Sequence, residues 1–81
     1  MPAIKVTKEM RCQRALKAAI VEMGMTQTTL AKRLGIDQST VSIWVQNPYK
    51  LRYSDLSDIG RILHIDIFGM MQEFEKKEEK A

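Results

Sequence analysis

The stretch that decides the fold runs from Gln27 to Gln46 and reads QTTLAKRLGIDQSTVSIWVQ. Apolar residues recur at helical spacing on both sides of Gly35. They are Leu30, Ala31 and Leu34 before the glycine, and Val41, Trp44 and Val45 after it. Thr26 and Asp37 are residue types that favour the N-cap of a helix, and glycine supplies the positive φ of a tight turn. We therefore predict two short helices joined by a turn, the second spanning Gln38 to Gln46.

Three further helices are predicted outside this stretch. Upstream, apolar residues at helical spacing indicate a helix that ends near Gly24: Cys12, Leu16, Ala19, Ile20 and Met23. Downstream, a fourth helix opens at Tyr53 or Ser54, and Asp66 caps a fifth that begins at Ile67. Strand-type alternation does not persist anywhere in the sequence. The chain is therefore predicted to be all-α, with five helices.

Length and charge indicate one domain followed by a short charged segment. The chain has 81 residues and a net charge of +3. Residues 73–81 hold three lysines and four glutamates, a balance of −1, which leaves +4 on residues 1–72. We assign residues 1–72 to the domain and residues 73–81 to a charged tail or an extension of the last helix. A moderately basic domain suits a phosphate backbone, although charge alone does not decide this.

Cysteine and histidine are too few for a metal or catalytic centre. Cys12 is the only cysteine and His64 the only histidine, so neither an internal disulfide nor a zinc cluster is expected. The sequence shows no nucleophile–base pair and no glycine-rich phosphate loop, so we expect neither an enzyme nor a cofactor. It also lacks a membrane-length apolar run and a signal peptide, so a cytoplasmic protein is expected. Cys12 is interpreted as a small buried apolar residue, with a redox-sensing thiol as the alternative.

The sequence resembles the Cro/cI-type (XRE) helix-turn-helix family of phage and bacterial repressors. The matching residues are Met25-Thr26-Gln27, Leu30-Ala31, Leu34-Gly35-Ile36, Gln38-Ser39 and Val41-Ser42-x-Trp44. The helical spacing on both sides extends the resemblance over roughly residues 8–72. It implies a five-helix, lambda-repressor-like domain in which helices two and three form the helix-turn-helix. The second of these helices would enter the major groove of double-stranded DNA.

The resemblance also implies which residues meet DNA. The residues expected at base edges are Gln38, Ser39, Ser42 and Ile43. A glutamine amide can pair with N6 and N7 of adenine, while Ile43 would pack against a thymine methyl or against the following loop. The residues expected at phosphates are Gln27, Thr40, Gln46, Asn47, Tyr49, Lys50 and Arg52. Contacts of this second kind set register and affinity without reading sequence.

A module of this size covers only a few base pairs. We therefore expect a homodimer on a two-fold operator, at least on DNA. The predicted dimer contacts lie on the last helix: Ile67, Phe68, Met71 and Phe74. A repressor is the first interpretation. The alternative is a DNA-binding antitoxin or a protein-interaction module of a two-component pair. No small-molecule effector site is evident.

One departure from the family carries a structural prediction. Many relatives pair an arginine of helix one with a glutamate that follows the Trp44 position, and this chain has Ile20 and Val45 there. Replacing a whole buried ion pair by apolar residues is often neutral or stabilising, whereas losing one partner is costly. We therefore expect Ile20 and Val45 to touch in the core.

Overall fold

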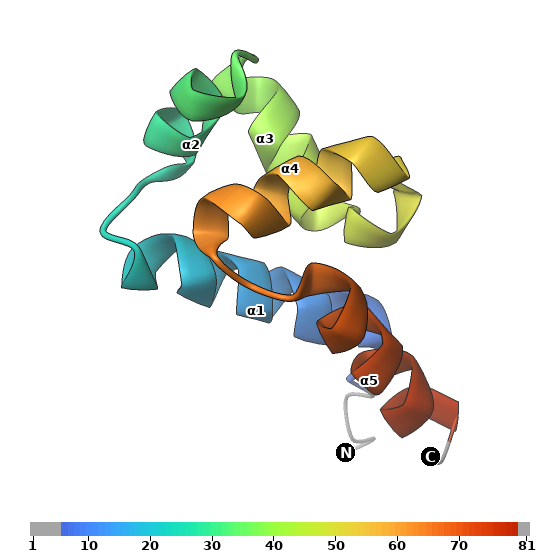
Figure 1. Cartoon of the computed structure of the whole chain (residues 1–81). Helices are drawn as coiled ribbons and strands as arrows, with labels where there is room; N and C mark the ends of the chain where they lie inside the picture. The colour runs from blue at the N-terminus through green and yellow to red at the C-terminus, as the bar shows by residue number, and fades with distance from the viewer. Residues whose placement is uncertain (1–5, 80–81) are drawn as a thin grey trace, which may run out of the picture.

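The structure is a computed structural model that describes residues 6–79, and it consists of helices and their connections (Figure 1). The α-helices are α1 (Lys8–Glu22), α2 (Gln27–Leu34), α3 (Gln38–Gln46), α4 (Tyr53–Leu63) and α5 (Ile67–Glu79). A short 3-10 turn, η1 (Pro48–Lys50), connects α3 to α4. The described residues contain no strand, so the predicted all-α class with five helices is confirmed.

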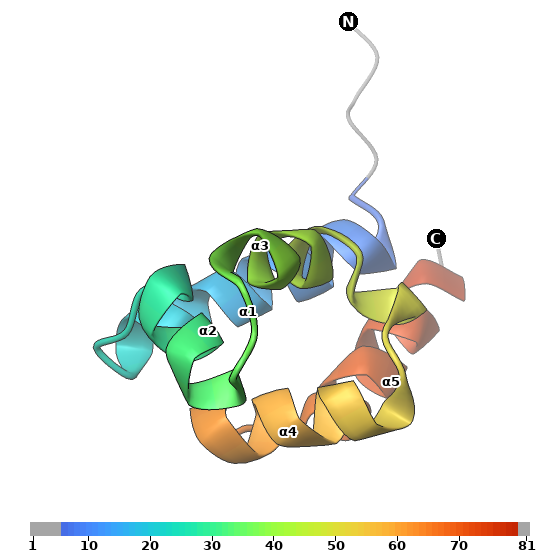
Figure 2. The ribbon, with the colours of Figure 1, turned by 90° about the horizontal axis from the view of Figure 1, so that it is seen from above.

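The helices are arranged in two groups that share one core (Figures 1 and 2). Helix α5 packs along α1, and η1 contacts α1 near its beginning. Helices α2 and α3 form a tight corner, with α3 lying against α1 and α2 against α4. Helix α4 in turn packs against α5. This arrangement leaves one side of α3 unpacked.

The core is formed by the apolar faces that the helical spacing predicted. Its buried members are Cys12, Leu16, Ile20, Met25, Leu30, Ala31, Val41, Val45, Leu56, Ile59, Leu63, Ile67 and Met71. Partly buried apolar residues, among them Leu34, Ile36 and Trp44, pack around them. Apolar burial is the main stabilising term in a domain of this size. The core therefore draws on every α-helix and fixes α3 from its inner side.

The N-terminal caps follow the sequence with one exception. The Thr26 hydroxyl accepts the Thr29 backbone N–H at 3.2 Å, and Asp66 Oδ1 accepts the Gly69 N–H at 3.2 Å. Both caps are confirmed, and each satisfies an amide that has no partner within its helix. Asp37 occupies the N-cap position of α3, but its side chain makes no capping hydrogen bond.

A residue with positive φ stands at the C-cap of α2 and of α4, Gly35 at 73° and His64 at 56°, and Gly24 at 69° follows the C-cap of α1. At the corner between α2 and α3, the Ile36 N–H donates to the Ala31 carbonyl at 3.0 Å across Gly35. This bond belongs to the Schellman arrangement that closes a helix on a left-handed residue. It turns the chain within three residues and brings α3 directly onto α2.

Helix α5 settles what the sequence left open about the charged segment. It continues without a break from Ile67 to Glu79, so residues 73–79 extend the last helix. Residues 80–81 of the predicted tail lie outside the described residues.

Ile20 and Val45 are both buried, with 4% and 3% of their surfaces exposed. They belong to the same core cluster, in which α1 packs against α3. A charge placed at either position would therefore enter apolar surroundings. Direct contact between the two side chains stays a prediction.

Val45→Glu should lower the free energy of unfolding by about 3–5 kcal/mol, because the new carboxylate would be buried without a partner. Urea denaturation of the variant measures this loss. Gln46→Glu is the matched control, since it adds the same charge at the exposed neighbouring position. Ile20→Arg combined with Val45→Glu should recover part of the loss if the two side chains touch. An unchanged unfolding midpoint for Val45→Glu would contradict the packing described here.

Cys12 is fully buried in the core, as the sequence predicted. Burial raises the pKa of its thiol to about 11, and the nearby negative charge of Glu9 acts in the same direction. The thiol therefore stays protonated near neutral pH, and a protonated thiol is a poor nucleophile and a poor target for oxidation. These surroundings favour a structural Cys12 over a redox sensor.

Cys12 should make the stability of the protein fall with rising pH above about 9. The unfolded thiol ionises near its ordinary pKa of 9.0, while the folded thiol holds its proton until about 11. The unfolded state thus releases a proton first, and stability is lost as pH rises from 9 to 11. Denaturation of the wild type and of Cys12→Ala over this range isolates the contribution of Cys12. The advantage of the wild type should shrink as pH rises, and a constant difference would contradict the raised pKa.

Candidate nucleic-acid interface

Helix α3 has one face in the core and the other in solvent. Val41 and Val45 are almost completely buried, whereas Gln38 and Ser39 are exposed at the beginning of the helix. Ile43 keeps 59% of its surface exposed one turn further on. Single exposed apolar residues are common on protein surfaces, and Val21 of α1 is 74% exposed, so it is the place of Ile43 on α3 that makes it a candidate contact.

Three other residues that were predicted to contact DNA, Ser42 at a base edge and Thr40 and Gln27 at phosphates, are less exposed to solvent. Ser42 and Thr40 are half-buried on α3. Gln27 is the first residue of α2 and is also half-buried. Ala31, with 2% exposure, lies in the core at the corner, where a small side chain lets α2 and α3 approach closely.

Two side-chain amides hold the end of α3. Gln13 Nε2 donates to the Gln46 carbonyl at 2.6 Å, and Asn47 Nδ2 donates to the Ile43 carbonyl at 3.2 Å. The bond from Gln13 satisfies a carbonyl of the last turn, where carbonyls lack a partner within the helix. The Ile43 carbonyl also accepts the Asn47 backbone N–H at 3.0 Å, so the Asn47 amide is its second donor. Gln13 was missed by the sequence analysis. Its only signal was its place next to Cys12, on the edge of the apolar face of α1.

The connection after α3 presents two cations to solvent. Pro48 is buried and Leu51 packs against the core, while Lys50 and Arg52 are exposed. The inward-facing residues anchor the backbone of the connection, while the exposed side chains of Lys50 and Arg52 can reach toward a phosphate. A cleft of about 460 Å³ lies between this connection and α3, lined by Ile43, Trp44, Asn47, Lys50, Leu51, Arg52 and Asp55. Ile43 therefore borders both the open face of α3 and this cleft.

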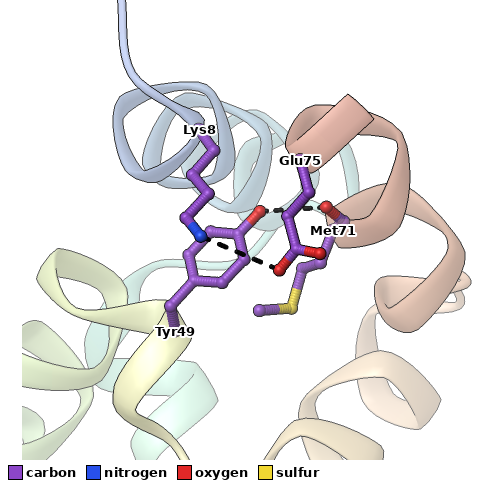
Figure 3. A network of polar contacts seen from close by, with 4 residues as sticks. All are labelled: Lys8, Tyr49, Met71 and Glu75. Atoms are coloured by element: carbon purple, nitrogen blue, oxygen red, sulfur yellow. Dashed lines mark hydrogen bonds and ion pairs between the residues drawn. The ribbon is translucent and has the colours of Figure 1, made fainter. Parts of the chain in front are cut away.

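Tyr49, which the sequence analysis placed at a phosphate, has a hydrogen-bond partner in α5. Its hydroxyl donates to the Met71 carbonyl of α5 at 3.1 Å (Figure 3). The Lys8 ammonium lies 4.9 Å from the centre of the tyrosine ring. A tyrosine has one O–H proton to donate, and here it is directed toward α5. The phosphate contact predicted for Tyr49 stays a prediction, and it would require the hydroxyl to leave Met71.

The structure also narrows the predicted dimer contacts. Ile67 and Met71 are buried in the core of the protomer, with 2% and 9% exposure, so they have little surface to offer a second copy. Phe68 and Phe74 are only partly buried. The ring of Phe68 stacks on that of Tyr53 at 4.5 Å, and Tyr53 is 74% exposed. Apolar surface that remains on this side thus includes Tyr53, which the sequence analysis did not select.

The residues that the structure describes form neither a metal site nor a membrane-spanning helix. No group of three or more His, Cys, Asp or Glu side chains among them is placed to hold a metal ion. None of the described helices is both long and apolar enough to cross a membrane.

Comparison with known proteins assigns the family. The profile of the Cro/C1-type helix-turn-helix DNA-binding domain matches residues 15–68, which is more than half of the chain. This span contains all of α2, α3, η1 and α4. Comparisons with curated proteins and with solved structures gave no match. The chain belongs to the Cro/C1-type helix-turn-helix family of DNA-binding domains.

Proposed function

We propose that this protein is a sequence-specific transcriptional regulator that places α3 in the major groove of DNA and acts as a repressor. The observation that carries the proposal is the two-sided character of α3. Its inner face is fixed in the core through Val41 and Val45, its outer face presents Ser39 and Ile43, and Gln38 is exposed at its first position. A helix held in this way can meet base edges without first being ordered, which avoids the entropic cost of ordering it on binding.

The exposed side chains of α3 can contact bases both by hydrogen bonds and by apolar packing. Gln38 is exposed at the first position of the helix. Its side-chain amide can donate to N7 of adenine and accept from the N6 amino group at the same time. Ser39 can donate or accept, and is therefore less selective. Ile43 offers an apolar surface that suits a thymine methyl group. These features support a preference for sites containing A·T pairs.

The polar residues around α3 suit the DNA backbone. Lys50 and Arg52 are exposed beyond the end of the helix, and cations are the main source of affinity for phosphates. The neutral members of the proposed phosphate set are Gln27, Thr40, Gln46 and Asn47. Contacts from both ends of the corner would fix the register of α3 in the groove.

A dimer would supply the specificity that one module lacks. Two copies related by a two-fold axis would read half-sites about one helical turn apart. The apolar surface of Phe68, Phe74 and Tyr53 supports contacts through α4 and α5. Such a dimer would repress by occupying its operator, because occupancy alone excludes other proteins from the same DNA.

Binding to DNA tests this proposal directly. Duplexes selected from random DNA are compared with scrambled duplexes by fluorescence anisotropy over a series of salt concentrations. We expect a specificity ratio of about 10³ or more, together with a steep loss of affinity at high salt. Absence of binding at low salt would overturn the proposal and favour a protein-interaction module.

Gln38→Ala should weaken binding to the selected duplex by about 1–3 kcal/mol and leave binding to scrambled DNA nearly unchanged, because a base contact is lost. Lys50→Ala is the matched control. It should weaken binding to both duplexes and reduce the salt slope by about 1, because a phosphate contact is lost. Equal losses on both duplexes for Gln38→Ala would show that Gln38 does not read a base.

A further inference from the structure

Tyr49 connects the loop that follows α3 to helix α5, over 22 positions of sequence. Its hydroxyl donates to the Met71 carbonyl at 3.1 Å in a half-buried position (Figure 3). Above its ring lies the Lys8 ammonium, which also pairs with Glu75 at 3.9 Å. We call this set of four residues, Lys8, Tyr49, Met71 and Glu75, the Tyr49 latch.

The hydroxyl bond is the strongest part of the latch. Its acceptor is a backbone carbonyl of a helix, and the Met71 side chain anchors that helix in the core with 9% exposure. The Lys8 and Glu75 side chains are 40% and 47% exposed, and ion pairs this exposed contribute little. Among the polar contacts of the latch described here, the hydrogen bond to Met71 therefore contributes most to holding Tyr49 against α5.

The loop that Tyr49 holds has few other constraints. The η1 turn has three residues, and its backbone bonds are local, from the Lys50 N–H to the Asn47 carbonyl and from the Leu51 N–H to the Pro48 carbonyl. Bonds of this kind give the turn its shape but do not fix its position against α1 and α5. That position depends on the buried Pro48, on Leu51 and on Tyr49.

We propose that Tyr49 is a positioning residue for DNA binding, which acts by holding Lys50 and Arg52 in register with the DNA backbone. Lys50 follows Tyr49 directly and Arg52 lies two residues beyond it. Both are exposed, and their own side chains give the loop no anchor in the core. The inference rests on the proposed function, and it assigns to α5 a part in DNA binding at a distance from the bases.

Tyr49→Phe removes the hydroxyl and keeps the ring under Lys8. Its affinity for the selected duplex should fall about three- to tenfold, as expected for the loss of one hydrogen bond. Ser57→Ala is the control, because it removes a hydroxyl from an exposed position on α4 that has no proposed role in binding. Circular dichroism and thermal melting confirm that each variant is folded at the temperature of the binding assay.

A double-mutant cycle separates positioning from a general loss of stability. In the background of Lys50→Ala with Arg52→Ala, adding Tyr49→Phe should change affinity less than twofold, because the cations it positions are gone. Hydrogen exchange of the Lys50 and Leu51 amides should be faster in Tyr49→Phe, with α2 and α3 unchanged.

The outcomes distinguish this inference from the proposed function. Failure of the wild type to bind DNA at low salt would overturn the proposed function and this inference with it. If the wild type binds and Tyr49→Phe binds equally well, the inference alone is wrong. The same holds if the full loss persists without Lys50 and Arg52, because Tyr49 would then act independently of them.

Discussion

Val41 and Val45 lie on the side of α3 that packs into the core, and both are almost fully buried. Their burial fixes the rotation of α3 about its own axis. If the helix were turned by half, the valines would enter water and Ser39 and Gln46 would face the core, at a cost of several kcal/mol. The same apolar packing that stabilises the domain thus determines which side chains can reach DNA.

The far end of α3 is fixed by polar contacts from two distant helices. Gln13 of α1 holds the Gln46 carbonyl, and Tyr49 ties the following loop to α5. Helices α1 and α5 pack along each other. Both contacts therefore fix the loop relative to the same pair of helices. The outer helices of this fold therefore support the helix-turn-helix structurally and also fix the position of the cations beside it.

Much of the fold could be predicted from local patterns, since apolar spacing gives the inner face of each helix, and Thr26, Gly35 and Asp66 mark ends by their own chemistry. The directions of individual polar side chains could not. The bond from Tyr49 to Met71 joins residues far apart in sequence, and nothing near Tyr49 indicates it. Ile67 and Met71, predicted as dimer contacts, are buried in the protomer, and this too could not be predicted from the sequence. A helical apolar stripe has the same spacing whether it faces its own core or a second copy.

The measurement that tests the role of α3 most directly is an NMR titration of the ¹⁵N-labelled protein with a selected duplex, which maps the amides that respond to DNA. We predict that the largest shift changes fall on residues 38–46 and on the loop at 47–52, with small changes along α4. Changes concentrated on α4 and α5, with α3 unaffected, would contradict the assignment of α3 as the helix that meets DNA.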